Sequence, residues 1–212
     1  ETGYSVKVKA AIQEKVSEWS EGAEFTTPKD LWCCAWKECP DGVNEERQYS
    51  VDEMSPIIAT GSGYCTLIGT SPLPQNKVTS WSIKILSSKE NDGDDVNIGV
   101  APSDINQNES CNHKKCGWYF NCYNSVLYSG PPHNHNYPYI GCGIGKNAGE
   151  HIHTGDSVGV VMETAKGELS FVVNGVNLGV AFEGIPLDKP LVPCVILGER
   201  GDTVELDTFE VN

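Results

Sequence analysis

The 212-residue chain has few basic side chains and no long apolar run. Its 15 Lys and Arg are outnumbered by 29 Asp and Glu, which gives a formal net charge of -14. Nucleic acids and anionic membrane surfaces attract clustered basic residues, so this charge argues against both as partners. It favours a basic protein or peptide target, although acidity also keeps a domain soluble. No stretch approaches the roughly 18 consecutive apolar residues of a transmembrane helix.

Complete motifs for nucleotide, calcium and nucleophile chemistry are also missing. Residues 141–146 resemble a phosphate loop, but Ile140 stands where the first glycine belongs and no Ser or Thr follows the lysine. The acidic residues of 92–97 lack the spacing of an EF-hand loop. Gly61-Ser62-Gly63 lacks the outer glycines of a nucleophile elbow. The sequence therefore predicts no catalytic residue, no metal and no other cofactor.

The five histidines all lie between His113 and His153. His133 and His135 would place two imidazoles on one side of an extended chain, as would His151 and His153, with cysteines nearby. These spacings match no standard zinc motif, so we expect packed or solvated loop histidines. An enzyme with a Cys/His or zinc site is the least favoured alternative.

Nine cysteines is an odd number, whereas secreted disulfide scaffolds usually have an even one. Cys194 lies in an apolar run and is expected to be a buried thiol. Four other cysteines fall in one loop-rich region: Cys111, Cys116, Cys122 and Cys142. These four would be able to pair in an oxidising compartment, where the glycosylation sequon at Asn108 would also have meaning. We expect an intracellular, cytoplasmic protein, with a secreted or cell-surface protein as the alternative.

The first part of the chain is expected to stand outside the main domain. Glu1–Gly3 resembles a leader left after cleavage of a secretion signal, and we exclude it from fold prediction. Apolar residues then recur at spacings of four, four and three: Val8, Ile12, Val16 and Trp19. This pattern predicts an amphipathic helix over residues 5–19, followed by a polar linker. The helix would either pack on the domain or end an upstream coiled coil that supports an oligomer.

Asn174-Gly175 stands between two apolar runs and is the strongest structural signal in the chain. Both residues tolerate positive φ, so the pair predicts a two-residue type I′ hairpin turn. The turn sets three cross-strand pairs on one buried face: Val173 with Val176, Phe171 with Leu178, and Leu169 with Val180. Small residues on the other face, such as Gly159, predict a second layer packed closely there.

Four segments of the chain, in order, carry the motifs of a known family. They are IGVA at 98–101, CGWYF at 116–120, SVGVVMETAKGELSFVVNGVNLGVAF at 157–182, and LVPCVIL at 191–197. Together they resemble the SPRY domain family, in which the GW strand packs inside a β-sandwich. The resemblance covers residues from about Val78 to Val211, and segments from about Leu31 to Gly69 would supply the extra strands that often precede it.

The resemblance implies an all-β fold, a SPRY-type sandwich of two antiparallel sheets that is jelly-roll or concanavalin-like, here with a short N-terminal helix. We assign 1–29 to leader, helix and linker, and 30–212 to the domain, with extension strands at 30–76 and the SPRY core at 77–212. It also implies a non-catalytic module that recognises a protein or peptide and recruits it to a larger parent protein. The alternative is a carbohydrate-binding, lectin-like sandwich.

The loops around the sheets are expected to contact the target. In the SPRY family the segment after the LxPxVxL strand contributes to the peptide-binding face. The resemblance therefore implies ligand-binding roles for four residues: Leu197, Gly198, Glu199 and Arg200. Many family members place a bulky aromatic residue here, whereas this chain does not.

Two further loops are candidates from their composition and position. Residues 131–139 combine prolines, aromatic rings and amides, which suit a recognition surface or, equally, a loop folded over the sheet. The loop that follows Ala101 is the other candidate. The candidate ligand-binding residues of these loops are His133, Asn134, Tyr137, Tyr139, Asp104 and Asn106.

Overall fold

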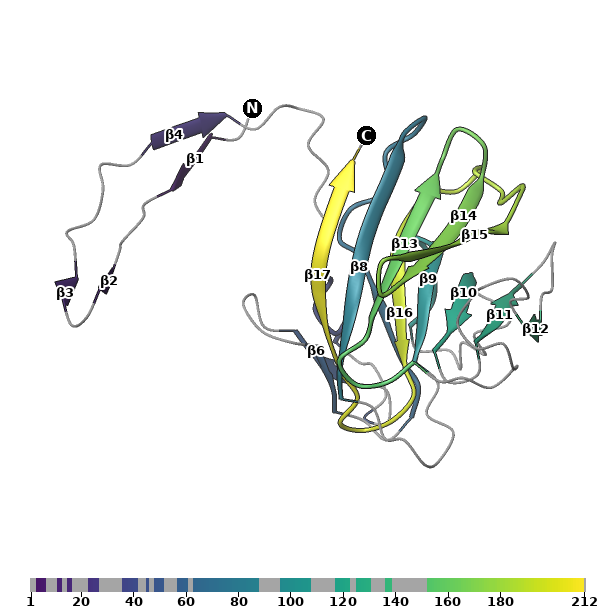
Figure 1. The fold of residues 1–212 in the computed structure, drawn as a ribbon, viewed down its shortest axis with the longest axis horizontal. Coiled ribbons are helices and arrows are strands. Elements are labelled where there is room, and N and C mark those ends of the chain that lie inside the picture. The colour runs from purple at the N-terminus through teal and green to yellow at the C-terminus, as the bar shows by residue number, and fades with distance from the viewer. Residues whose placement is uncertain are drawn as a thin grey trace. The chain divides into compact units, whose positions relative to one another are not determined.

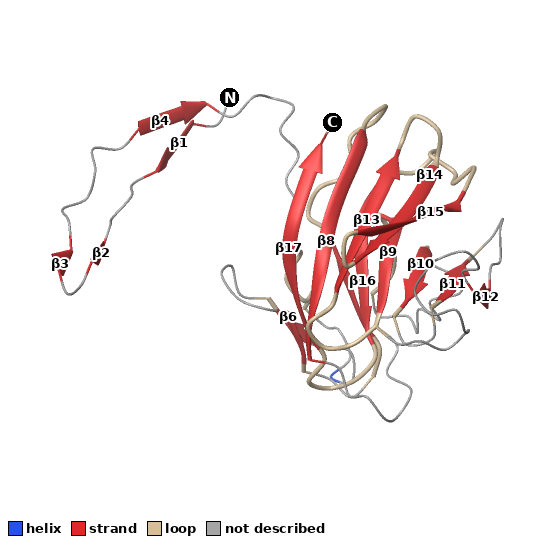
Figure 2. Ribbon diagram, viewed as in Figure 1, coloured by secondary structure: helices blue, strands red, loops and turns tan. Residues whose placement is uncertain are grey.

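In the computed structural model the chain divides into two units, residues 1–32 and residues 33–212. The structure describes residues 3–6, 11–12, 15–16, 23–26, 36–41, 45, 48–51, 57–60, 63–87, 96–107, 117–122, 125–130, 136–138 and 152–211. Within these residues the larger unit is a sandwich of two antiparallel sheets (Figure 1), and strands dominate both units (Figure 2). The predicted all-β sandwich is confirmed.

The smaller unit consists of two short antiparallel pairs. In it β1 (Gly3–Val6) pairs with β4 (Ala23–Thr26), and β2 (Ala11–Ile12) pairs with β3 (Lys15–Val16). The helix predicted over residues 5–19 is not shown, because every described residue in that range lies in a strand. The reason is that β-branched residues carry the apolar pattern, and such residues favour extended chain.

One sheet of the larger unit has six strands, in the order β12-β11-β10-β9-β16-β7. Their bounds are β7 (Cys65–Ile68), β9 (Asn97–Pro102), β10 (Trp118–Asn121), β11 (Val126–Ser129), β12 (Asn136–Pro138) and β16 (Leu191–Leu197). Every side chain of β10 and β16 is buried. The GW strand and the thiol of Cys194 therefore lie inside the molecule, as predicted.

The other sheet has seven strands, in the order β15-β14-β13-β8-β17-β6-β5. Their bounds are β5 (Tyr49–Ser50), β6 (Ile57–Ala59), β8 (Val78–Ser87), β13 (Ser157–Glu163), β14 (Glu168–Val173), β15 (Val176–Phe182) and β17 (Thr203–Val211). In β8, β13 and β14, buried side chains alternate with half-buried ones. The buried set faces the first sheet, where the rings of Phe120 and Phe171 meet with centroids 5.4 Å apart.

Among the described residues, a further layer packs on the outer face of the six-stranded sheet. Phe120 faces the seven-stranded sheet, so its neighbour Tyr119 points the other way, into a buried cluster with Cys194. Ile105, from the loop after β9, packs against this cluster. The second layer predicted beside Gly159 is wrong for the described residues, because the outward side chains there line an open groove.

The Asn174-Gly175 turn is confirmed, with φ values of 48° and 81°. It joins β14 to β15 and sets Val173 opposite Val176, as predicted. Val176 is nevertheless 52% exposed, because β15 is an edge strand that leaves the core at this end. The prediction that this side chain is buried is therefore wrong.

Further along the hairpin, β15 contains a β-bulge that the sequence analysis did not predict. Gly179 has a φ of 86°, and its N–H donates to Asn177 Oδ1 at 2.8 Å. The register shifts once there, between Ser170 and Val172 of β14, and a second time between Leu169 and Ser170, so Leu169 pairs with Phe182 and not with Val180. Val180 is 46% exposed, which corrects its predicted place in the core.

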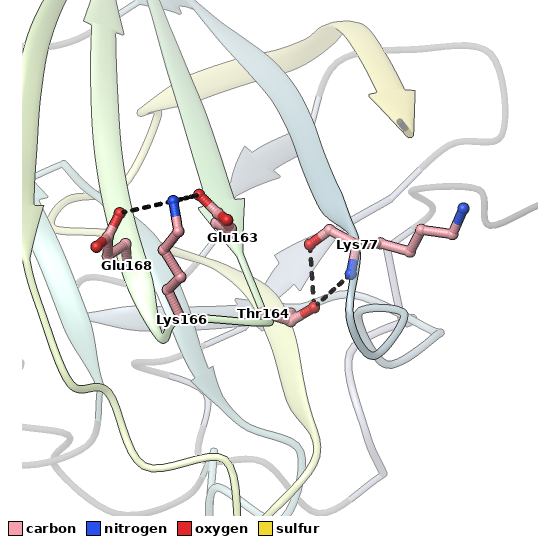
Figure 3. A network of polar contacts seen from close by, with 5 residues as sticks. All are labelled: Lys77, Glu163, Thr164, Lys166 and Glu168. Carbon is pink, nitrogen blue, oxygen red and sulfur yellow. Dashed lines mark hydrogen bonds and ion pairs between the residues drawn. The ribbon is translucent and has the colours of Figure 1, made fainter.

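The turn between β13 and β14 is fastened to the start of β8 (Figure 3). The buried Thr164 hydroxyl donates to the Pro74 carbonyl at 2.7 Å and accepts the Lys77 N–H at 3.0 Å. On the surface, Lys166 Nζ lies 2.9 Å from a carboxylate oxygen of Glu163. These contacts hold the sheet's central strands together at one end.

Candidate functional site

The segment after β16 forms a turn that is held from beneath by a buried carboxylate. Asp202 is 0% exposed, and its Oδ2 accepts hydrogen bonds from the N–H groups of Gly198 at 3.1 Å and Glu199 at 2.9 Å. Its own N–H donates to the Glu199 carbonyl at 3.2 Å. Gly201 has a φ of 94°, a conformation that suits glycine and closes the turn.

The same turn is tied to β6 on the seven-stranded sheet. The Gly201 N–H donates to the Ala59 carbonyl at 2.9 Å, and the Ala59 N–H donates to the Asp202 carbonyl at 3.0 Å. Arg200 is exposed, and its Nε donates to the Thr60 carbonyl at 2.7 Å. This bond uses one of the five N–H donors of the guanidinium group and orients the others. Arg200 is therefore a surface cation with a fixed direction.

An aromatic residue, Tyr64, directly precedes β7, the strand that neighbours β16 at the turn. Leu197 pairs with Cys65 between β16 and β7, so the same register continued by one residue sets Tyr64 opposite Gly198. Tyr64 is 37% exposed and is one of the exposed large hydrophobic side chains of the described residues. We call this surface the turn patch: Thr60, Tyr64, Glu199 and Arg200.

The four residues predicted here by resemblance differ in what they present. Leu197 is fully buried, so its side chain supports the turn from the core. Gly198 is also buried, whereas Glu199 is half-buried and Arg200 is exposed. Two of the four therefore offer side chains at the surface. The sequence analysis missed Tyr64, because its place depends on strand pairing with a segment far along the chain.

Asp104 lies at the opposite end of β16 from the turn patch. It follows Pro102, which pairs with Leu191, whereas the patch adjoins Leu197. Six residues of strand separate the two ends, roughly 20 Å. Lys189 Nζ lies 2.8 Å from Asp104 Oδ2, and this hydrogen bond holds the pKa of the Asp104 carboxyl below its usual value.

The loop that contains Asp104 and Asn106 then returns along the six-stranded sheet. Asn106 is exposed, but Gln107 is buried, and its Nε2 donates to the Thr66 carbonyl at 2.6 Å and the Tyr49 hydroxyl at 2.9 Å. The Tyr49 hydroxyl donates to the Lys37 carbonyl at 3.2 Å. Burial raises the pKa of Tyr49, and the bond from Gln107 offsets this only in part. This network fastens the segment before β5 to the sheet.

The loop at residues 131–139 is described only in its strand β12. Tyr137 pairs with Leu127 at the edge of the six-stranded sheet. That edge is four strand spacings from β16, roughly 19 Å, so the backbone of Tyr137 does not adjoin the turn patch. The other predicted residues of this loop lie outside the described residues: His133, Asn134 and Tyr139.

The described residues contain no group of three or more His, Cys, Asp or Glu side chains placed to hold a metal ion. Of the predicted histidine pairs only His153 is described, and it is exposed. In the described part of the chain the free thiols are Cys39, Cys65, Cys122 and Cys194. No helix among the same residues has the length and apolar character needed to cross a membrane.

Comparison with solved structures finds the same fold. The crystal structure of the SPRY domain of human HERC1 is 21% identical, with a TM-score of 0.57, over 78% of this chain and 96% of that one. The crystal structure of a human SPRY domain is 16% identical, with a TM-score of 0.52, over 81% of this chain and 96% of that one. A search of curated proteins found no match.

The family comparison covers the part of the chain that carries the sandwich. The model of the SPRY domain matches residues 78–209, which is more than half of the chain. This range contains β8 to β16 and most of β17, and it includes the turn after β16. SPRY domains are generally protein-interaction modules without catalytic activity. The chain belongs to the SPRY domain family.

Proposed function

We propose that this domain is a non-catalytic recognition module that binds a protein or peptide at the turn patch and recruits it to a larger parent protein. The observation that carries the proposal is the rigid turn of residues 198–201. Two of its N–H groups are held by the buried Asp202 carboxylate, and Arg200 is oriented by Thr60. A surface fixed in advance loses little conformational entropy when a ligand binds.

The side chains of the turn patch suit protein recognition. Tyrosine and arginine are the residue types that most often dominate the free energy of protein interfaces. Tyr64 offers a partly exposed ring, and Arg200 offers N–H donors to a carboxylate or carbonyl of the target. The net charge of -14 favours a target that also carries basic residues outside this contact.

The remaining candidate residues would extend the contact of a larger target. Asn106 is exposed on the loop that Gln107 ties to β7. Asp104 lies in the loop after β9, and Tyr137 lies on the edge strand β12, so a target that reaches them would span the six-stranded sheet as well as the turn. We propose His133, Asn134 and Tyr139 as contacts of the same kind.

Selection from a phage-displayed random peptide library, followed by calorimetry, tests the proposal. Peptides selected on the wild-type domain are expected to lose at least about tenfold in affinity for Arg200→Ala and for Tyr64→Ala, because both side chains would be interface anchors. Lys77→Ala is the matched control for charge, and Val176→Ala is the control for exposed apolar surface, since both are exposed away from the turn. Unchanged affinity for both patch variants would contradict the proposal.

A further inference from the structure

The outward face of two adjacent strands, β8 and β13, has a floor of small residues. On β8 and β13 these are Ser80, Ser82, Ser157 and Gly159. The large side chains of the same strands, such as Trp81 and Val160, point into the core and are at most 1% exposed. The floor therefore lies close to the backbone, and the neighbouring larger side chains stand above it.

This floor belongs to an open groove of about 510 Å³. The volume lies within the range of about 300–1,000 Å³ that is usual for ligand sites. Val161 and Val172 add apolar surface to the groove, and Asn174-Gly175 and Asp207 also line it. The groove thus combines hydroxyl groups, an apolar strip, an amide and a carboxylate.

The polar residues at the rim are held in place by the fold. Asn174 Nδ2 donates to Asp156 Oδ1 at 2.8 Å, and its Oδ1 accepts the Ser157 N–H at 3.0 Å. Asp207 lies at a register shift between Leu206 and Thr208 of β17 and is exposed. A β-bulge of this kind redirects a side chain out of the regular alternation.

The charges around the groove favour a basic ligand. Lys84 Nζ lies 3.7 Å from Glu205, and Lys166 Nζ lies 2.9 Å from Glu163, so these carboxylates already have cationic partners. Asp207 has no ion-pair partner among the described residues. The carboxylate that lines the groove is therefore the one available to a cation from outside.

We propose that this groove is a second recognition surface, distinct from the turn patch, which binds an extended basic segment of a partner protein. Small side chains of the segment lie on the serine and glycine floor, and its backbone exchanges hydrogen bonds with the serine hydroxyls. An apolar side chain covers Val161 and Val172, and a lysine or arginine pairs with Asp207. A sugar fits less well, because the only aromatic residue in the lining, Trp81, has its ring in the core.

A nitrogen-15 NMR titration with the peptide acetyl-Ser-Val-Lys-Val-Ser-amide tests this proposal. Saturable shifts are expected at the amides of Ser82, Gly159 and Gly175, with affinity in the millimolar range, as suits a short peptide. Ser82→Trp, which fills the groove, should abolish them. Asp207→Asn should weaken binding by about two- to fivefold, as for one exposed ion pair. Arg200→Ala should leave the titration unchanged.

Several outcomes would overturn the proposal. These are the absence of shifts at millimolar peptide, equal shifts with the glutamate analogue of the peptide, and shifts that map to the turn patch. Groove signals that move with protein concentration alone would assign the surface to a second copy of this chain instead. Asp207→Asn keeps the shape of the side chain and removes its charge. It therefore tests whether the Asp207 carboxylate attracts the lysine of the peptide, even if Ser82→Trp does not fold.

Discussion

At the residue scale, Asp202 is the side chain on which the turn patch depends. Its carboxylate is the acceptor for two backbone N–H groups at the surface end of β16. It also follows Gly201 and precedes β17, so it fixes where the chain leaves the turn and enters the other sheet. The residues that would touch a target are exposed, but a buried residue sets their positions.

Replacing this carboxylate should destabilise the domain and loosen the turn. We expect Asp202→Ala to cost about 2–4 kcal/mol of unfolding free energy, because hydrogen bonds to a charged group contribute about 1.5–3 kcal/mol each and their donors would lose their acceptor. Urea denaturation measures the loss, and Asp188→Ala, at an exposed position, is the control. An Asp202→Ala variant as stable as the wild type would show that the turn does not depend on this side chain.

Tyr49 should make stability fall at alkaline pH. Burial raises the pKa of its hydroxyl above the ordinary value of 10.0, so the folded state keeps the proton longer than the unfolded state does. The contribution of this hydroxyl to the unfolding free energy is fully present below pH 10.0, and it is lost as the pH rises through the pKa of Tyr49 in the folded state.

The difference between wild type and Tyr49→Phe isolates this effect from the other tyrosines. The variant should be less stable near neutral pH by about 1 kcal/mol, because Gln107 loses a hydrogen-bond partner. Its unfolding free energy should then fall less steeply with pH above about 10 than that of the wild type. Urea denaturation across this range is the measurement, and parallel curves would contradict the assignment.

At the scale of the elements, alternation and turn chemistry were enough to predict the core strands. The buried positions of β13 and β14 follow the predicted period of two, and Asn174-Gly175 forms the predicted turn. The bulge at Gly179 was not predictable, since glycine also fits a regular strand and its φ follows from the local chain path. The helix predicted over residues 5–19 is not shown, and the described residues of that range lie in strands, which β-branched residues favour.

Close approach of two strands makes Gly99 essential to the six-stranded sheet. A Cβ atom added there would lie 1.9 Å from the Trp118 carbonyl oxygen on β10. We expect Gly99→Ala to cost about 3 kcal/mol, at the upper end of overpacking, because backbone cannot move aside.

Gly159→Ala is the matched comparison for this substitution. Its added Cβ would lie 3.1 Å from the Val172 Cβ and 3.4 Å from the Val172 carbonyl oxygen, a far milder approach than at Gly99, so the cost should be below about 1 kcal/mol. Thermal unfolding of the two variants measures the difference. Equal losses of stability in the two variants would show that the close approach of β9 and β10 at Gly99 is not what makes that substitution costly.

At the scale of the whole molecule, the outer faces of the two sheets differ in what packs on them. On the far side of the six-stranded sheet, Ile105 from the loop after β9 packs against a buried cluster, whereas described residues on the outward face of β8, β13 and β14 line an open groove. The resemblance to the SPRY family predicted the turn after β16 as a binding surface, but it predicted neither Tyr64 nor the groove. Both depend on pairings between distant strands, which are visible only once the chain is folded.

The most direct test of the central proposal is to map where a selected peptide binds. In a nitrogen-15 NMR titration with a peptide selected on the wild-type domain, we expect the largest shifts at Tyr64, Glu199 and Arg200. These shifts should be lost in Arg200→Ala and kept in Lys77→Ala. Shifts confined to the groove at Ser82 and Gly159, or unchanged by Arg200→Ala, would contradict the assignment of the turn patch as the recognition site.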